Sequence, residues 1–187
     1  MKFYCYYSVV SFSNCYLLGR EGVQDALLID PGIFDEGLLR LIEGNGFYPR
    51  HVLITHAHQG HLSGVRTLRK IYDPALYALE PDALEYPAER IAEAHPLQLA
   101  GFTVRVIATP GHSQDSACFR IDRMLFTGDT LLAGSVGQAD TEYEKALLLA
   151  SVREKLLSLE PGLLLFPGHG PPSTLEIEQR FNPHLRE

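Results

Sequence analysis

Three histidines lie within one short segment of the chain, from Thr55 to His61, whose sequence is THAHQGH. They follow an apolar run at His51–Thr55 that predicts a buried strand, and scaffolds present functional side chains where strands end. Alternate residues of an extended chain project to one side, so His56 and His58 can face a common ligand. Neutral imidazole is the commonest side-chain metal ligand. This spacing therefore indicates a metal site.

Three further candidate ligands stand far away in the sequence. His112 lies in the segment TPGHS, Asp129 in FTGDT and His169 in FPGHG, each beside a glycine directly after an apolar strand. Glycine allows the backbone to turn sharply and to approach its neighbours closely. Together with the histidine cluster, these segments predict four strand ends that meet at one place.

The elements that must position these residues alternate between strand and helix patterns. Apolar and aromatic runs predict eight strands, at Lys2–Val10, Asn14–Leu18, Ala26–Ile29, His51–Thr55, Phe102–Ala108, Ala117–Ile121, Met124–Thr127 and Leu163–Phe166. Helical spacing predicts four helices, one capped by Asp35 and ended by Gly44-Asn45-Gly46, and others at His61–Ile71, Thr141–Leu159 and Thr174–Phe181. The segment Asp73–Pro96 is expected to hold a short strand and a surface helix.

Length and composition favour an ordinary globular enzyme that acts on a small molecule. The 187 residues, 45% of them hydrophobic and 21% charged, suit a single domain over residues 1–187. A net charge of −7 argues against binding to nucleic acid or to anionic membranes. The three cysteines form no disulfide framework, and neither a signal peptide nor a membrane span is evident. We expect a cytoplasmic location, and the sequence leaves the oligomeric state open.

These motifs resemble the metallo-β-lactamase superfamily and, within it, the small glyoxalase II-like (hydroxyacylglutathione hydrolase-like) hydrolases. The resemblance covers nearly the whole chain, from the segment NCYL at 14–17 through IDPG at 29–32 to Asn182-Pro183. It is especially close over residues 125–137, LFTGDTLLAGSVG. It implies a mixed α/β fold, a four-layer αββα sandwich, with the metals at one edge of the two sheets.

The resemblance also implies a role for each ligand. The first metal would be bound by His56, His58 and His112, Asp129 would bridge two metals, and His61 and His169 would bind the second. Asp129, His56 and His58 are the candidate catalytic residues. Asp30, in the Asp-Pro-Gly turn, is expected to fix the loop rather than to bind metal, and Thr55 to orient the ligand loop.

The chain departs from the family pattern at three places. The family motif is His-x-His-x-Asp-His, and Gly60 stands where its Asp should be, which removes a negative charge from the second site. We therefore predict one strongly bound Zn²⁺ and a weak or empty second site, unless Asp115 or a water compensates. Gln138 replaces a usual arginine, and the sequence lacks the extra helical domain with which larger glyoxalase II enzymes hold glutathione.

The expected activity is the hydrolysis of thioesters or esters by a metal-activated water. The alternative is a persulfide dioxygenase-like enzyme, in which one Fe²⁺ is held by His56, His112 and Asp129. A third possibility is a non-catalytic relative whose altered site only stabilises the fold.

Overall fold

The computed structural model describes residues 1–186, and Glu187, the last residue of the predicted domain, lies outside them. Two six-stranded sheets and a two-stranded ribbon form its framework. The first sheet contains, in spatial order, β1 (Lys2–Tyr7), β2 (Asn14–Gly19), β3 (Asp25–Ile29), β4 (Tyr48–Leu53), β5 (Ala75–Ala78) and β6 (Glu89–Arg90). The second contains β14 (Ser173–Thr174), β13 (Leu164–Pro167), β10 (Met124–Gly128), β9 (Ala117–Ile121), β8 (Phe102–Ala108) and β7 (Leu97–Leu99). The ribbon pairs β11 (Leu131–Leu132) with β12 (Ser135–Val136).

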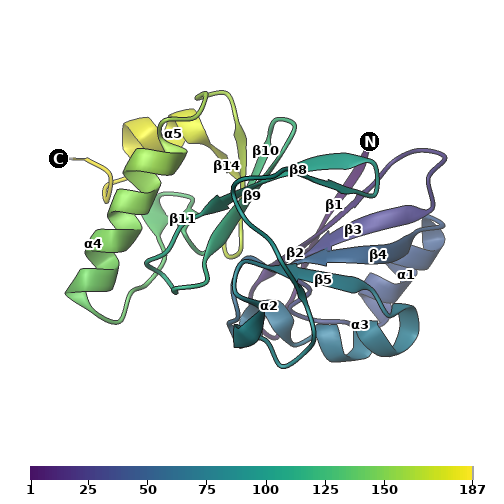
Figure 1. The fold of residues 1–187 in the computed structure, drawn as a ribbon. Coiled ribbons are helices and arrows are strands. Elements are labelled where there is room, and N and C mark those ends of the chain that lie inside the picture. The colour runs from purple at the N-terminus through teal and green to yellow at the C-terminus, as the bar shows by residue number, and fades with distance from the viewer. Residues whose placement is uncertain (187) are drawn as a thin grey trace.

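Helices cover the outer face of each sheet (Figure 1). The first sheet carries α1 (Glu36–Gly44), α2 (Gln59–Leu62), α3 (Val65–Tyr72) and the 3₁₀ turn η1 (Pro81–Ala83) on its side of the molecule. The second carries α4 (Glu142–Ser151), the π-helical turn η2 (Val152–Leu156) and α5 (Leu175–Phe181). Among residues 1–186, no helix is long and apolar enough to cross a membrane.

Three apolar clusters hold these layers together. Successive side chains of a strand point to opposite faces, so each central strand contributes to two clusters. In β2, Leu18 packs between the sheets while Leu17 packs under α1 and α3. In β10, Phe126 packs between the sheets while Leu125 packs under α4 and η2. The predicted αββα sandwich is thereby confirmed, and burial on both faces explains why these strands are continuous apolar runs.

One helix that the sequence predicts as continuous is two helices in the structure. Residues 61–71 were expected to form a single helix, but the chain breaks at Ser63-Gly64 between α2 and α3. The Gly64 nitrogen donates to the Pro31 carbonyl across 2.9 Å, and a Cβ on Gly64 would lie 2.5 Å from that oxygen. The break therefore brings the backbone of the Asp-Pro-Gly turn directly against the start of α3.

The surface helix predicted within Asp73–Pro96 is also wrong. Its expected strand is confirmed as β5, but only the short turn η1 follows, with Pro81 at its start. Beyond it, the Ile91 nitrogen donates to the Ala78 carbonyl, and β6 extends the first sheet. Prolines lack the N–H that a helix interior needs, and pairing with an open sheet edge is available instead.

Two helices start where the sequence predicted, and each start is capped by a side chain. Asp35 accepts a hydrogen bond from the Leu38 nitrogen at 3.0 Å, as a helix N-cap does. Thr141 and Glu144 form a reciprocal capping box at the start of α4. The long helix predicted from Thr141 is confirmed in position, but its last part is the π-helical turn η2. Ser151, at the end of α4, donates to the Pro110 carbonyl at 2.7 Å and so anchors the loop that precedes His112.

The strand directions bring the candidate ligands to one edge. In the second sheet, β9 runs antiparallel to both β8 and β10, while β13 runs parallel to β10. The carboxyl ends of β8, β10 and β13 therefore lie on the same side, and His112, Asp129 and His169 follow them. The predicted meeting of strand ends is confirmed, because the loop after β4 reaches the same edge with its histidines.

Candidate metal centre

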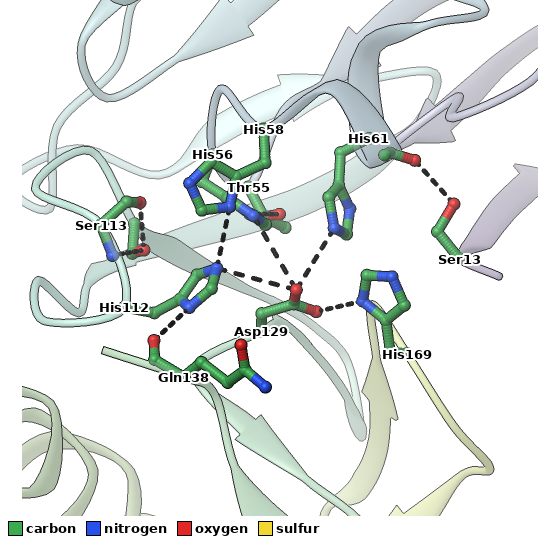
Figure 2. A network of polar contacts seen from close by, with 12 residues as sticks. Ser13, Thr55, His56, His58, His61, His112, Ser113, Asp129, Gln138 and His169 are labelled. Carbon is green, nitrogen blue, oxygen red and sulfur yellow. Dashed lines mark hydrogen bonds and ion pairs between the residues drawn. The ribbon is translucent and has the colours of Figure 1, made fainter. Parts of the chain in front are cut away.

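Asp129 lies at the centre of the cluster of candidate ligands (Figure 2). Its Oδ2 atom is 3.6 Å from His61 Nε2, 3.7 Å from His112 Nε2 and 4.0 Å from His56 Nε2. Its other oxygen accepts a hydrogen bond from His169 Nδ1 at 2.7 Å. His56 and His169, which are 113 positions apart in sequence, thus both lie within 4.0 Å of the Asp129 carboxylate.

The donor atoms form two overlapping groups, each within 4.8 Å. One group contains His56, His58 and His112, and the other contains His56, His61 and Asp129. In the first group, His112 Nε2 is 3.0 Å from His58 Nδ1, a distance that one shared proton or one shared cation can satisfy. The first group is the three-histidine set expected for the first metal.

Asp30 and Thr55 fix the orientation of two of these imidazoles. One Asp30 oxygen accepts from the Thr55 backbone nitrogen at 2.8 Å, and the other accepts from the Thr55 hydroxyl and from His61 Nδ1. The Thr55 hydroxyl donates its single hydrogen bond to Asp30. Its oxygen can therefore only accept in the 3.0 Å hydrogen bond with His56 Nδ1, which makes Nδ1 the donor. With a metal bound, both imidazoles would present a lone pair on Nε2, the ring nitrogen that faces Asp129.

Two buried nitrogen atoms have no hydrogen-bond partner. Within residues 1–186, His56 Nε2 and His61 Nε2 are buried and unpaired. Nearly all buried polar atoms of folded proteins are paired, so an exception needs a physical reason. A cation bound between these lone pairs and the Asp129 carboxylate supplies one, and nitrogen with carboxylate oxygen suits a divalent metal. The residues present therefore fit a metal ion.

His112 is oriented by a contact that the sequence did not reveal. Its Nδ1 donates to the backbone carbonyl of Gln138 across 2.7 Å, which leaves Nε2 free to face the centre. A backbone carbonyl leaves no trace in residue type, so no sequence signal could have identified this partner. The contact couples the first metal group to the segment after β12.

His169 is placed differently from the other imidazoles. Its Nδ1 donates to Asp129, and its Nε2 lies 3.4 Å from the Ser11 carbonyl. Both ring nitrogens thus face acceptors, and His169 belongs to neither group of converging donor atoms. Of the three ligands that the resemblance implies for the second site, His61 and Asp129 converge with His56, and His169 contacts Asp129 through Nδ1.

Position 60 has room for the missing side chain. A Cβ on Gly60 would have the Ser11 Cβ, 3.8 Å away, as its nearest neighbour. The Gly60 carbonyl accepts from the Ser13 hydroxyl at 2.6 Å, which a side chain would leave intact. Asp115 does not replace the lost carboxylate, because its Oδ2 accepts from the Ala57 nitrogen at 2.7 Å and it joins neither donor group.

The two buried histidines, His56 and His61, have pKa values shifted in opposite directions. Burial lowers the pKa of His56 to about 2, with the neighbouring His61 acting in the same direction. Burial also opposes the charged form of His61, but the carboxylates of Asp30 and Asp129 outweigh it and raise its pKa to about 10. Burial would raise the pKa of Asp129, but the hydrogen bond from His169 and the positive charge of His61, 3.6 Å away, outweigh it and hold that pKa well below its usual value.

Two glycines allow the strand ends to approach so closely. A Cβ on Gly168 would lie 2.6 Å from both Asp129 Oδ1 and His61 Cε1. Gly128 adopts a φ of 49°, and a Cβ there would lie 2.5 Å from the Thr55 hydroxyl. Larger residues at either position would push the ligand-bearing loops apart.

A cavity of about 380 Å³ opens beside the centre. Its walls include His112, Asp129 and His169 on one side. The β11–β12 ribbon and the following residues, up to Gln138, form the other side. A small molecule in this cavity would lie next to the candidate ligands.

Residues 9–169 match the family model of the metallo-beta-lactamase superfamily. An uncharacterized protein of Mycobacterium bovis is 31% identical, and the match covers 92% of each chain. The hydroxyacylglutathione hydrolase GloC of Haemophilus influenzae is 28% identical, again over 92% of each chain.

Solved structures agree with this match. The B3 metallo-beta-lactamase BLEG-1 superposes with a TM-score of 0.89 at 29% identity, covering all of both chains. ETHE1 from Myxococcus xanthus has a TM-score of 0.89 at 26% identity, covering 98% of this chain and 84% of that one. TTHA1623, crystallised in a di-iron-bound form, has a TM-score of 0.76 at 34% identity, covering 91% of this chain and 94% of the other.

Proposed function

This chain belongs to the metallo-beta-lactamase superfamily, and from that premise we propose that it is a metal-dependent hydrolase of thioesters or esters. The observation that carries the proposal is the pair of unpartnered ring nitrogens, His56 Nε2 and His61 Nε2, that face the Asp129 carboxylate in a buried centre. The name of the Haemophilus influenzae relative, a hydroxyacylglutathione hydrolase, supports a thioester as the substrate.

Under this proposal, His56, His58 and His112 would hold the main metal, Zn²⁺, and Asp129 would complete the centre. When bound, a divalent metal makes hydroxide available at neutral pH and polarises the substrate carbonyl. The attacking water oxygen forms a bond to the carbonyl carbon, the bond to the sulfur or alkoxy oxygen breaks, and a carboxylic acid leaves with a thiol or alcohol.

The residues of the chain orient this reaction. Asp129 presents a carboxylate that stays ionised, because its pKa lies well below its usual value, and that can orient the attacking water by accepting a hydrogen bond from it. His169 holds that carboxylate through its 2.7 Å hydrogen bond, and the Gln138 carbonyl holds the ring of His112. Burial of His56 and His61 excludes bulk water from the inner side of the centre.

We also propose that the second metal binds weakly. Gly60 offers no carboxylate, and both nitrogens of His169 face acceptors of the protein. Three protein ligands with a fourth position for water are a sufficient set for catalytic zinc, so the first site can serve alone.

The direct test is hydrolysis by zinc-loaded protein of a panel of thioesters and esters, including S-lactoylglutathione. We expect turnover that is abolished by His56→Ala and retained by His95→Ala, a matched control at an exposed position. Absence of turnover on every substrate by protein with its full metal content would contradict the proposal.

A second candidate is an iron-dependent oxygenase acting on a persulfide. It is favoured by the placement of His56, His112 and Asp129, whose donor atoms can form a two-histidine, one-carboxylate set with open positions. The similarity to TTHA1623, which was crystallised in a di-iron-bound form, supports iron at this centre. Oxygen uptake with glutathione persulfide by the iron form would favour it, and full activity of zinc-only protein would exclude it.

A further inference from the structure

The cavity beside the metal centre has a wall that carries no basic side chain. Beyond the candidate ligands it is lined by Leu132, Ser135, Val136 and Gln138 together with backbone. Asp129 is the carboxylate in this lining, and neither lysine nor arginine is part of it. A substrate group that enters the cavity thus meets apolar side chains, one hydroxyl and one carboxamide.

The imidazoles of the lining do not supply a free cation either. His112 directs Nδ1 to the Gln138 carbonyl and Nε2 to the His58 ring. His169 is paired with Asp129, so any positive charge on it is already balanced. A carboxylate held against Leu132, Val136 and Gln138, on the side of the cavity away from the metal ligands, would lose its hydration without gaining a charged side chain as a partner.

The shape of the cavity is fixed by α5. Glu178 is 1% exposed, and its carboxylate accepts from the Gly134 backbone nitrogen at 2.9 Å. The Asn182 carboxamide donates to that carboxylate and to the Ser135 carbonyl, each at 2.9 Å. These contacts tie the β11–β12 ribbon from behind, so the wall that faces the substrate is largely formed before binding.

We propose that this cavity binds an uncharged, apolar acyl group of the thioester, and that Gln138 sets this preference. The inference rests on the proposed hydrolase function and names its substrate class. Figure 2 shows the Gln138 side chain on the opposite side of Asp129 from His56 and His58. Within residues 1–186 no hydrogen bond engages its carboxamide, and the side chain is exposed, so it is free to contact the substrate.

Gln138 acts here as a specificity-determining residue. Its backbone carbonyl serves the metal centre, whereas its side chain faces the cavity, so a substitution changes the charge of the wall while the carbonyl contact to His112 is kept. An arginine at this position would offer a carboxylate-bearing substrate the bidentate partner that the native wall lacks.

The test compares two thioesters of the same neutral thiol, N-acetylcysteamine, with pentanoyl and glutaryl acyl groups, which differ by a terminal carboxylate. We expect zinc-loaded native protein to prefer pentanoyl in kcat/KM by about tenfold or more, the scale of one uncompensated charge. Gln138→Arg should reduce or reverse the ratio, and Gln138→Met should keep it. Gln98→Arg, the same change at the exposed middle residue of β7, is the matched control and should leave the ratio unaltered.

Calorimetric binding of the corresponding non-hydrolysable thioethers gives a readout that is independent of turnover. The same order of affinities is expected, with the glutaryl analogue gaining affinity only in Gln138→Arg. Equal kcat/KM for both thioesters in the native protein, or a ratio unchanged by Gln138→Arg, would overturn this inference alone. No turnover of either thioester by metal-loaded protein, by contrast, would count against the proposed hydrolase function.

Discussion

His61 and Asp30 form a fully buried pair, with His61 Nδ1 donating to Asp30 Oδ2 across 2.9 Å. The same carboxylate accepts a hydrogen bond from the Thr55 hydroxyl, and that hydroxyl oxygen accepts one from His56 Nδ1. One side chain in the Asp-Pro-Gly turn thus sets which nitrogen of two imidazoles faces the metal centre. Asp30 is not itself in either donor group, and it would act on a bound metal only through these contacts.

Asp30→Asn should therefore weaken metal binding without removing a ligand. We expect zinc affinity to fall by about 10- to 100-fold, because the partners that orient metal-bound histidines contribute on that scale. Competition with a chromogenic chelator measures it. Asp25→Asn, at a carboxylate exposed on β3 and paired with Arg50, is the control and should keep native affinity. Equal affinities in both variants would contradict the role assigned to Asp30.

Gly60→Asp should strengthen the second site. The position has no neighbour closer than 3.8 Å to a new Cβ, and the added carboxylate restores the charge that the family motif carries. We expect zinc binding to rise from one to two equivalents per chain, measured by titration under equilibrium dialysis. Gly44→Asp, where a Cβ meets no atom within 4 Å, is the control and should bind one. One equivalent in both variants would show that the missing Asp does not limit the site.

The metal-free protein should lose stability as the pH falls below about 6.5. The folded-state pKa of His56 is depressed to about 2, whereas an unfolded histidine titrates near 6.5. A depressed folded pKa favours the neutral form, so its contribution is complete above pH 6.5 and is lost progressively towards pH 2. Urea midpoints between pH 8 and pH 4 measure this loss. His56→Gln should reduce the dependence of the urea midpoint on pH, and His95→Gln should not. An unchanged dependence in His56→Gln would contradict the depressed pKa of His56.

On the alkaline side, His61 should have the opposite effect. Its folded pKa is raised to about 10, so its contribution is complete below pH 6.5 and is lost as the pH rises through 10. We expect urea midpoints of metal-free protein to decline between pH 7 and pH 10, and this decline to shrink in His61→Gln. A decline of the same size in that variant would contradict the buried pairing of His61 with Asp30 and Asp129.

Gly64→Ala should destabilise the fold by about 1–3 kcal/mol, the usual effect of forcing a methyl group into a packed position. The new Cβ would lie 2.5 Å from the Pro31 oxygen and from the Ile33 carbonyl carbon. Urea unfolding of the metal-free protein provides the measurement. Gly44→Ala, which meets open space, should be neutral or slightly stabilising. Native stability of Gly64→Ala would contradict the close packing of the Asp-Pro-Gly turn on α3.

The sequence predicted the layers and the meeting of ligands well, because both depend on local patterns. Buried strands such as β10 are continuous apolar runs, and the residues after them, Asp129 among these, follow directly from the strand ends. The cap at Asp35 was readable because a side chain makes the contact, and the helix predicted from Thr141 begins there.

The rest depended on contacts between distant backbone atoms. The break at Gly64 arises from its packing against Pro31, and the orientation of His112 is set by the Gln138 carbonyl. The residue types do not reveal either contact. The surface helix expected within Asp73–Pro96 was wrong for the same reason, because the pairing of β6 with β5 at the edge of the first sheet is a tertiary contact. The contact of His169 Nε2 with the Ser11 carbonyl likewise could not be predicted, because it depends on where the fold places Ser11.

The measurement that tests the metal centre most directly is metal content per chain by elemental analysis, before and after loading with zinc or iron(II). One tightly held zinc per chain, lost in His56→Ala and retained in His95→Ala, is the result that the three-histidine site predicts. Protein that takes up neither zinc nor iron(II) after loading would contradict the metal centre itself, and with it both proposed activities.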